Sequence, residues 1–306
     1  MTPSLDEHNI ITHAWEKVHQ EKPHVHHVNY PRYIVRLRHN DFFKILSSFI
    51  ELQSITILEV GCGSGAFSLY LSALGNHVVA LDYYLQPLQH ISKGKREFEQ
   101  KKHINLNLDI VMGDIRSMAF PDETFDVVFN SGVLEHYSTP KNRQEILKEM
   151  SRVTRCSGYL AIIIPNKLHT FSSLWDFLIR KFSDFDMFDL PEHSILPAEI
   201  KTDLENVGLE VTWIGAINVY DTLSLYPQWF VLRFLSYLLR VLLPMPANKW
   251  RDKFGVKILA MQRSVLDGKT NQIDRLDLIV IIYSAVPKIL SPASPRPGSI
   301  YPLLFN

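Results

Sequence analysis

The sequence has little cysteine, no net charge and no long uncharged apolar run. Its 306 residues include two cysteines, Cys62 and Cys156, and 32 acidic side chains balanced by 32 basic ones. Two cysteines cannot build the disulfide framework of a small secreted domain, so we expect a reducing compartment and a cytoplasmic protein. Zero net charge removes the global electrostatic case for nucleic acid, and we expect no nucleic-acid partner.

Signals for export or membrane insertion are also missing from the sequence. No uncharged apolar run reaches the roughly 18 to 20 residues that span a bilayer. The first residues lack the basic and then apolar pattern of a signal peptide. The stretch 225–246 is nevertheless crowded with aromatic and aliphatic side chains, with Arg233 and Arg240 seven positions apart. It fits either a lid or dimer helix buried against the rest of the protein, or a membrane-surface helix or apolar substrate tunnel. Both readings favour a substrate with a sizeable hydrophobic part, and they make 225–246 the candidate surface for homodimerisation or peripheral membrane contact.

What the sequence does contain is an alternation of short apolar strands with helical patterns. Hydrophobic residues make up 46% of the chain and charged residues 21%, an ordinary globular composition. Nearly continuous apolar strands separated by helices indicate a parallel sheet covered on both faces. The pattern therefore predicts an α/β, doubly wound fold with strands at residues 55–60, 77–81, 107–112, 125–131, 159–164, 209–215 and 276–286.

The same pattern suggests three parts of the chain. Residues 1–50 are expected to form an N-terminal helical cap, and residues 51–286 the main domain, with insertions at about 169–194 and 218–275. Residues 287–306 read as a proline-rich C-terminal tail. A histidine-rich stretch in the cap contains His24, His26 and His27, but no cysteine or carboxylate cluster accompanies it. We interpret it as a solvated loop rather than a zinc site.

A glycine loop follows the first predicted strand, in the sequence ILEVGCGSGAF at residues 57–67. Gly61, Gly63 and Gly65 stand at the carboxyl end of that strand, where ligands bind in open α/β sheets. Glycine allows a sharp turn and a close backbone approach, and the helix that follows offers its N-terminal amides. The loop also satisfies the dinucleotide pattern G-x-G-x-x-G/A, so a nicotinamide dinucleotide remains an alternative ligand.

Three acidic residues at successive strand ends help to decide between these ligands. Glu59 precedes the glycines, where a carboxylate would repel a pyrophosphate and attract a cationic amino acid. Asp82 ends the second strand, about 20 residues on, where an acid can accept both ribose hydroxyls. Asp114 follows the third strand and can accept from the exocyclic amine of a base. Asp82 or Asp114 alone could be a turn residue or helix cap, but together with Glu59 and the glycines they describe S-adenosylmethionine better than NAD.

With these residues in view, the sequence resembles the class I S-adenosylmethionine-dependent methyltransferases, in particular the small-molecule branch with the pattern E/D-x-G-x-G-x-G. The resemblance covers Ile55 to Asn166 through four ordered blocks, LEVGCGSGAF, VVALDYY, VMGDIRSMAFPDETFDVVFNSGVLEHY and EMSRVTRCSGYLAIIIPN. It implies a Rossmann-like, seven-stranded, mostly parallel sheet whose last strand is antiparallel, which we assign to residues 276–286. It also implies a cofactor site made of Glu59, Gly61, Cys62, Gly63 and Gly65 at the methionine end, Asp82 at the ribose, Asp114 and Ile115 at the adenine, and Ser131 beside the methionine, with Tyr83 as a further cofactor-binding residue.

The catalytic chemistry points to histidines in loops at the carboxyl ends of the strands. A sulfonium methyl group is already activated, so the protein must orient a nucleophile and remove its proton where needed. His136 is the first candidate base, although it could be purely structural, and His193 and His169 are the others. Ubiquinone-type relatives carry a further metal-binding glutamate where Gly132 stands here. Glu135 and His136 alone make a poor site, so we predict no metal.

The sequence thus predicts a methyltransferase that acts on an O or N atom of a small, partly hydrophobic metabolite. An NAD-dependent oxidoreductase is the first alternative. A noncatalytic protein that keeps the fold as a scaffold or membrane-surface module is the second, because fold does not settle function.

Overall fold

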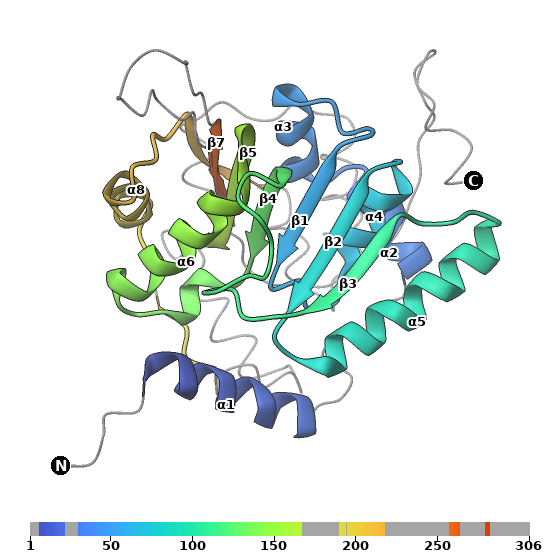
Figure 1. The fold of residues 1–306 in the computed structure, drawn as a ribbon, viewed down its shortest axis with the longest axis horizontal. Coiled ribbons are helices and arrows are strands. Elements are labelled where there is room, and N and C mark those ends of the chain that lie inside the picture. The colour runs from blue at the N-terminus through green and yellow to red at the C-terminus, as the bar shows by residue number, and fades with distance from the viewer. Residues whose placement is uncertain are drawn as a thin grey trace, which may run out of the picture.

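A computed structural model of the chain describes residues 6–21, 30–166, 190–193, 195–217, 257–263 and 279–281. These residues form an α/β fold around one eight-stranded sheet in the order β3-β2-β1-β4-β5-β8-β7-β6 (Figure 1). The strands are β1 (Thr56–Val60), β2 (His77–Asp82), β3 (Leu108–Met112), β4 (Phe125–Ser131), β5 (Thr154–Pro165), β6 (Trp213–Ile217), β7 (Lys257–Arg263) and β8 (Ile279–Ile281).

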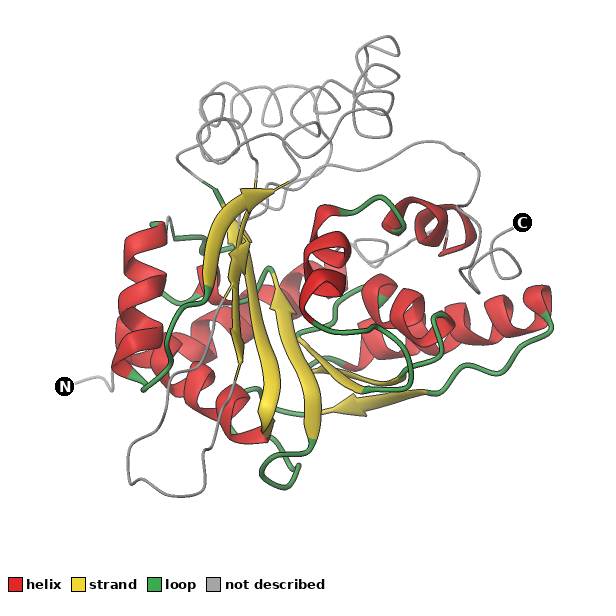
Figure 2. Ribbon diagram, turned by 90° about the horizontal axis from the view of Figure 1, so that it is seen from above, coloured by secondary structure: helices red, strands yellow, loops and turns green. Residues whose placement is uncertain are grey.

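The first five strands form the parallel sheet that the sequence predicts. All four of its neighbouring pairs, from β3–β2 to β4–β5, are parallel, and Leu58 of β1 lies opposite Val79 of β2 and Val128 of β4. Parallel strands need helical crossovers, so both faces of such a sheet are covered and its strands are apolar throughout. Figure 2 shows the sheet between two groups of helices. The carboxyl ends of β1 to β4 consequently meet along one edge.

The described helices begin and end close to their sequence signals. They are α1 (Glu7–Glu21), α2 (Tyr30–Leu37), α3 (Asp41–Phe49), α4 (Ala66–Ala73), α5 (Leu85–Lys102), the short 3-10 helix η1 (Leu134–His136), α6 (Pro140–Val153) and α8 (Pro197–Asn206). Helix α6 starts at Pro140, where the Thr139 side chain accepts from the Asn142 amide and proline suits the first turn.

The end of α8 explains why β6 starts four residues later than predicted. Gly208 has φ +83°, and the Leu209 amide donates to the Leu204 carbonyl. This left-handed helix end uses the residues directly after α8, so β6 begins at Trp213 rather than at 209.

Two expectations about the far side of the sheet need correction. The sheet has eight described strands rather than seven, and its antiparallel member is β7 rather than the strand at 276–286. Strand β8, the described part of that segment, pairs parallel with β5 and antiparallel with β7. Strand β7 lies inside 218–275, which the sequence analysis treated as an insertion. Its seven residues form a short apolar run between charged ends, and periodicity alone cannot identify such a run as a strand.

Several expectations fall outside the described residues. These are most of the insertions 169–194 and 218–275, the tail 287–306, the segment 225–246 with its two arginines, and His24, His26, His27 and His169. The division into cap, domain and tail stays a prediction. Within the described ranges, no helix is both long enough and apolar enough to cross a membrane.

Candidate functional site

The glycine loop joins β1 to α4 and has a backbone that requires glycine. Gly61, Gly63 and Gly65 have φ angles of +68°, +48° and +62°. A Cβ on Gly61 would lie 2.5 Å from Cγ2 of Val133, and one on Gly65 would lie 2.4 Å from Cγ1 of Ile91. The loop is therefore constrained both by its backbone conformation and by the side chains packed against it.

Asp82, the last residue of β2, forms a hydrogen bond with this loop. Its Oδ2 accepts from the Gly63 amide at 2.8 Å, and its Oδ1 accepts from the Tyr84 amide at 3.1 Å. Burial raises the pKa of Asp82, while these amide donors act in the opposite direction. A carboxylate offers about four acceptor positions, so Asp82 keeps capacity to accept a hydroxyl group of a ligand.

Glu59 serves the loop in a way that the sequence analysis did not anticipate. The side chain is buried in β1, and its Oε2 accepts from both the amide and the hydroxyl of Ser68, at 2.9 and 2.5 Å. Gly65, the N-cap of α4, has no side chain to offer, so Glu59 caps the first turn of α4 from the neighbouring strand. Burial raises the pKa of Glu59 to about 8, although the Ser68 hydrogen bonds lower it.

Tyr30 supports the same loop from α2. Its buried hydroxyl donates to the Ser64 carbonyl at 2.7 Å. Gly94 of α5 leaves room for the Tyr30 ring, because a Cβ there would come within 2.0 Å of it. No motif marks Tyr30 in the sequence, and sequence reasoning missed it.

Asp114 lies beyond the end of β3 and is held by Arg116. Its Oδ1 accepts from the Arg116 amide at 2.8 Å, and its Oδ2 accepts from Nη2 of Arg116 at 2.9 Å. Partial burial raises the pKa of Asp114, but the Arg116 hydrogen bonds and charge outweigh burial and bring the pKa below its usual value. The carboxylate is therefore ionised at neutral pH and ready to accept further hydrogen bonds.

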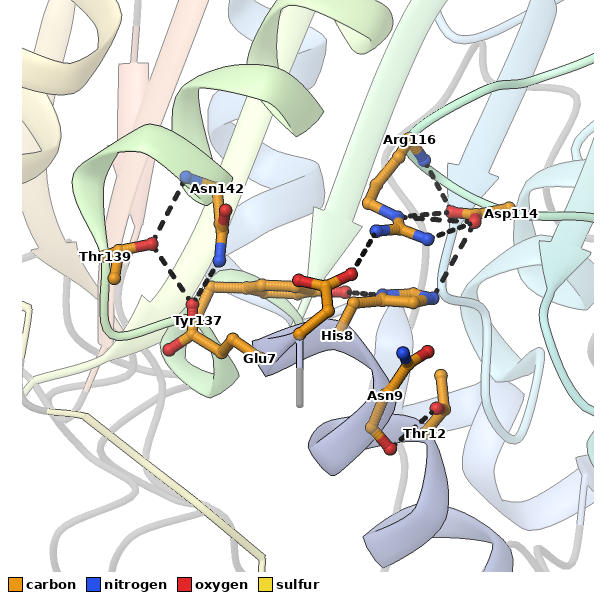
Figure 3. A network of polar contacts seen from close by, with 10 residues as sticks. Glu7, His8, Asn9, Thr12, Asp114, Arg116, Tyr137, Thr139 and Asn142 are labelled. Carbon is orange, nitrogen blue, oxygen red and sulfur yellow. Dashed lines mark hydrogen bonds and ion pairs between the residues drawn. The ribbon is translucent and has the colours of Figure 1, made fainter. Parts of the chain in front are cut away.

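Helix α1 lies beyond the carboxyl ends of the strands and contacts the part of the site around Asp114 and Tyr137 (Figures 1 and 3). Nδ1 of His8 is 2.9 Å from the Tyr137 hydroxyl, and Nε2 of His8 is 3.7 Å from Oδ2 of Asp114. The Tyr84 hydroxyl donates to the Thr12 carbonyl at 2.6 Å. Burial lowers the pKa of His8, as does the nearby Arg116, so the ring is neutral at pH 7.

Glu7 fastens the start of α1 to the start of α6. It accepts from the Ser138 amide at 2.6 Å and from Nδ2 of Asn142 at 2.5 Å. The sequence predicts a helix in this region, but it does not predict that the helix packs against the loop before α6. The available signal was the helical spacing of His8, Ile11 and Val18, all of which are buried.

The two candidate bases lie in neighbouring segments. His136 is buried in η1, and its Nδ1 is 2.9 Å from the Pro191 carbonyl. The His193 amide donates to the Glu135 carbonyl at 2.7 Å. Burial lowers the pKa of His136, and His193 lowers it further, while the carbonyls of Pro191 and Gly132 raise it. The contacts of His136 fasten residues 190–193 to the loop after β4.

The remaining predicted cofactor residues follow the ends of β1 to β4. Cys62 and Ile115 are buried, Ser131 is half-buried and Tyr83 is exposed. Burial raises the pKa of the Cys62 thiol well above its usual value, so Cys62 fits a packing role. Within the described residues, no three histidine, cysteine or acidic side chains lie close enough together to hold a metal ion.

Comparisons with known proteins agree with this arrangement. Residues 58–162 match a family described as Methyltransferase domain. A mouse protein named Probable tRNA methyltransferase 9B is 29% identical over 153 residues, which are 49% of this chain and 31% of that protein. A protein of Mycobacterium tuberculosis named as a probable S-adenosylmethionine-dependent methyltransferase is 29% identical over 126 residues, 41% of each chain.

A solved structure is also similar. The S-adenosylmethionine-dependent methyltransferase from Aquifex aeolicus aligns with 60% of this chain and 86% of its own, at 24% identity and a TM-score of 0.45. The chain spans less than half the length of the two curated relatives named above.

Proposed function

Because the chain belongs to the class I S-adenosylmethionine-dependent methyltransferase family through its domain at residues 58–162, we propose that it transfers a methyl group to an O or N atom of a small, partly hydrophobic metabolite. The observation that carries this proposal is the position of Asp82. Its buried carboxylate binds the Gly63 amide and keeps acceptor capacity at the ends of β1 and β2. This is the arrangement that ribose recognition beside a glycine loop needs.

The residues present fit S-adenosylmethionine, the cofactor typical of the family. At Gly61 and Gly65 of the glycine loop a side chain would clash with Val133 or Ile91, so the backbone itself lines the loop there. In our proposal Asp82 accepts from the ribose hydroxyls, and Asp114 with the Ile115 amide binds the adenine. Glu59 acts through Ser68 by holding α4 in place.

The cofactor supplies its methyl group on a cationic sulfur, so the protein's task is orientation of the acceptor and removal of its proton. Orientation alone can lower the barrier by about 7–11 kcal/mol in favourable cases. His193 is our preferred base, and His136 is a positioning residue, because the ring of His136 contacts the Pro191 carbonyl that precedes His193 by two residues. His169 remains a further candidate outside the described residues.

The small-molecule acceptor rests on the balanced charge of the chain and on its apolar segment at 225–246. A second candidate acceptor is tRNA, which is favoured by the name of the mouse relative, Probable tRNA methyltransferase 9B. Tight binding to tRNA would be expected to depend strongly on basic side chains, and the sequence shows no concentrated basic stretch.

Calorimetry with the full chain tests the cofactor. We expect S-adenosylhomocysteine to bind and NADH to give no heat, whereas the reverse result would favour the oxidoreductase alternative. The Asp82→Asn variant should weaken binding by about tenfold to a hundredfold, because a hydrogen bond to a charged group contributes about 1.5–3 kcal/mol. Asp109→Asn is the matched control, since Asp109 is an exposed acid of the neighbouring strand β3. Equal affinity of the two variants would contradict the proposed role of Asp82.

A transfer assay tests the reaction. Labelled S-adenosylmethionine is incubated with a metabolite extract and, separately, with unmodified tRNA. Label in a small molecule supports the proposal, and label in tRNA alone would select the second candidate. Cofactor binding without transfer to any acceptor in a broad panel would favour the noncatalytic alternative. His193→Ala should lower turnover more than it changes the affinity for the cofactor.

A further inference from the structure

His8 of α1 contacts Tyr83, a predicted cofactor residue, and lies close to Asp114, the residue proposed for the adenine. Its ring meets the Tyr83 ring edge to face, with centroids 5.6 Å apart. Its Nε2 lies 3.7 Å from Oδ2 of Asp114. The sequence separates His8 from Asp114 by more than a hundred residues, and no motif connects them.

The imidazole of His8 is held by one nitrogen only. Nδ1 lies 2.9 Å from the Tyr137 hydroxyl, which fixes the plane of the ring. Nε2 is buried, and no described residue gives it a hydrogen bond. The 3.7 Å to Asp114 exceeds hydrogen-bond length. A buried polar atom without a partner costs about 1–3 kcal/mol, so this nitrogen is placed for a group that the described residues do not supply.

The two atoms that face one another define the chemistry of that group. Asp114 presents an ionised carboxylate whose other acceptor positions are taken by Arg116. The neutral imidazole can present a lone pair at Nε2 while Nδ1–H donates to Tyr137. A carboxylate oxygen and an imidazole lone pair repel one another, and a nitrogen that carries two N–H groups can satisfy both. A primary amino group on an aromatic base has this form.

We propose that His8 is an adenine-recognition residue, with Nε2 accepting one N–H of the 6-amino group while Asp114 accepts the other. The inference rests on the proposed function and adds a residue of the N-terminal helix to the cofactor site. A 6-oxo base would present an oxygen to two acceptors. The pair His8 and Asp114 therefore selects 6-amino over 6-oxo nucleosides.

The test compares the affinities of the full chain for S-adenosylhomocysteine and S-inosylhomocysteine by calorimetry. Wild-type protein should prefer the adenosyl compound. His8→Ala should lower the affinity for that compound by about threefold to tenfold, the effect of one lost hydrogen bond, and leave the inosyl compound nearly unchanged. His8→Gln, which restores an acceptor, should recover part of the preference.

Two control variants on α1 separate recognition from docking of the helix. His13→Ala removes an exposed imidazole of the same helix and should behave as wild type. Glu7→Ala removes the hydrogen bonds between the start of α1 and the start of α6, but it changes neither His8 nor Asp114, the two proposed adenine contacts. If His8→Ala and His13→Ala show the same preference, the inference is wrong. It is also wrong if Glu7→Ala loses the preference as fully as His8→Ala, or if His8→Ala binds the adenosyl compound more tightly.

These outcomes are distinguishable from failure of the proposed function. If wild-type protein binds neither compound, both the function and the inference are overturned. If wild-type protein binds S-adenosylhomocysteine, and His8→Ala keeps the same preference for the adenosyl over the inosyl compound, only the inference is overturned.

Discussion

The two halves of the site are held together in different ways. Around the ends of β1 and β2, the glycine loop is fixed mainly by neighbours in sequence: Glu59 reaches Ser68 and Asp82 reaches Gly63, separations of 9 and 19 positions. Around the ends of β3 and β4, the contacts cross most of the domain. His8 meets Tyr137 over 129 positions, and Glu7 meets Ser138 over 131.

This difference matters for stability as well as for recognition. A locally fixed loop keeps its shape as long as its own strands and helix persist. The half around the ends of β3 and β4 depends on helix α1, which can detach locally without global unfolding of the domain. We therefore expect substitutions in the first half to act on the loop itself, and substitutions in the second half to act through the docking of α1 and the loop after η1.

The largest expected effect is on the buried ion pair that supports the second half. Nε of Arg143 donates to Oδ2 of Asp203 at 2.6 Å, and its Nη1 donates to the carbonyls of Tyr137 and Ser138. Arg143→Ala leaves the buried Asp203 carboxylate without its cationic partner, so we expect a loss of about 3–5 kcal/mol in the free energy of unfolding by urea denaturation.

Lys201→Ala provides the control, because Lys201 pairs with Glu205 on the surface of α8. Its loss should cost less than about 1 kcal/mol. Equal effects of the two substitutions would mean that the α6–α8 pair does not support the loop that carries Tyr137.

A smaller effect is expected in the first half, at Gly65. Gly65→Ala forces a Cβ into a left-handed position and against the Ile91 side chain, 2.4 Å away. Gly75→Ala suffers the same kind of backbone strain, with φ +94°, but its Cβ would have no atom within 4 Å. We expect Gly75→Ala to lose about 1–2 kcal/mol, and Gly65→Ala to lose more and also bind S-adenosylhomocysteine less tightly. Similar losses of stability and unchanged binding in both variants would show that the packing of the loop against α5 is unimportant.

The comparison also explains what could be predicted from the sequence. The strands β1 to β5 and the acids at the ends of β1 to β3 follow from periodicity and a motif, because both are local properties of the chain. Glu59 was assigned to the ligand for its charge, yet its Oε2 caps α4, since a motif reports that an acid is present and not which donor it meets. Strand β7 was missed because its short apolar run gives no periodic signal.

The contacts of the second half were beyond prediction for a physical reason. His8 is one of thirteen histidines, and its place beside Asp114 depends on how α1 packs across the strand ends. Tyr30 and Arg143 are similar cases, since each acts on backbone carbonyls that carry no sequence signature. Long-range packing of this kind appears only when the elements are assembled.

The smallest expected effect is on the docking of α1 by Glu7, and it depends on pH. Burial raises the pKa of Glu7, but its hydrogen bonds with Ser138, Asn142 and Thr139 outweigh burial and bring the pKa below its usual value. A carboxyl group whose pKa is lowered by folding stabilises the folded state above its unfolded pKa, and this contribution is lost as pH falls through the folded value. Glu7→Gln should therefore increase hydrogen exchange of the α1 amides at pH 7 by about threefold to tenfold, the range for one lost hydrogen bond.

Glu16→Gln, an exposed site on the same helix, should leave that exchange unchanged. In thermal unfolding, the difference between wild type and Glu7→Gln should shrink as the pH falls below the usual glutamate pKa of about 4.3, because the unfolded chain then binds a proton that the folded chain, with its lowered pKa, still excludes. A difference that stays constant down to pH 3 would show that the charge of Glu7 does not hold α1. In that case the apolar contacts of Ile11 and Val18 would hold α1 over the ends of β3 and β4, and the local opening of α1 would be independent of pH.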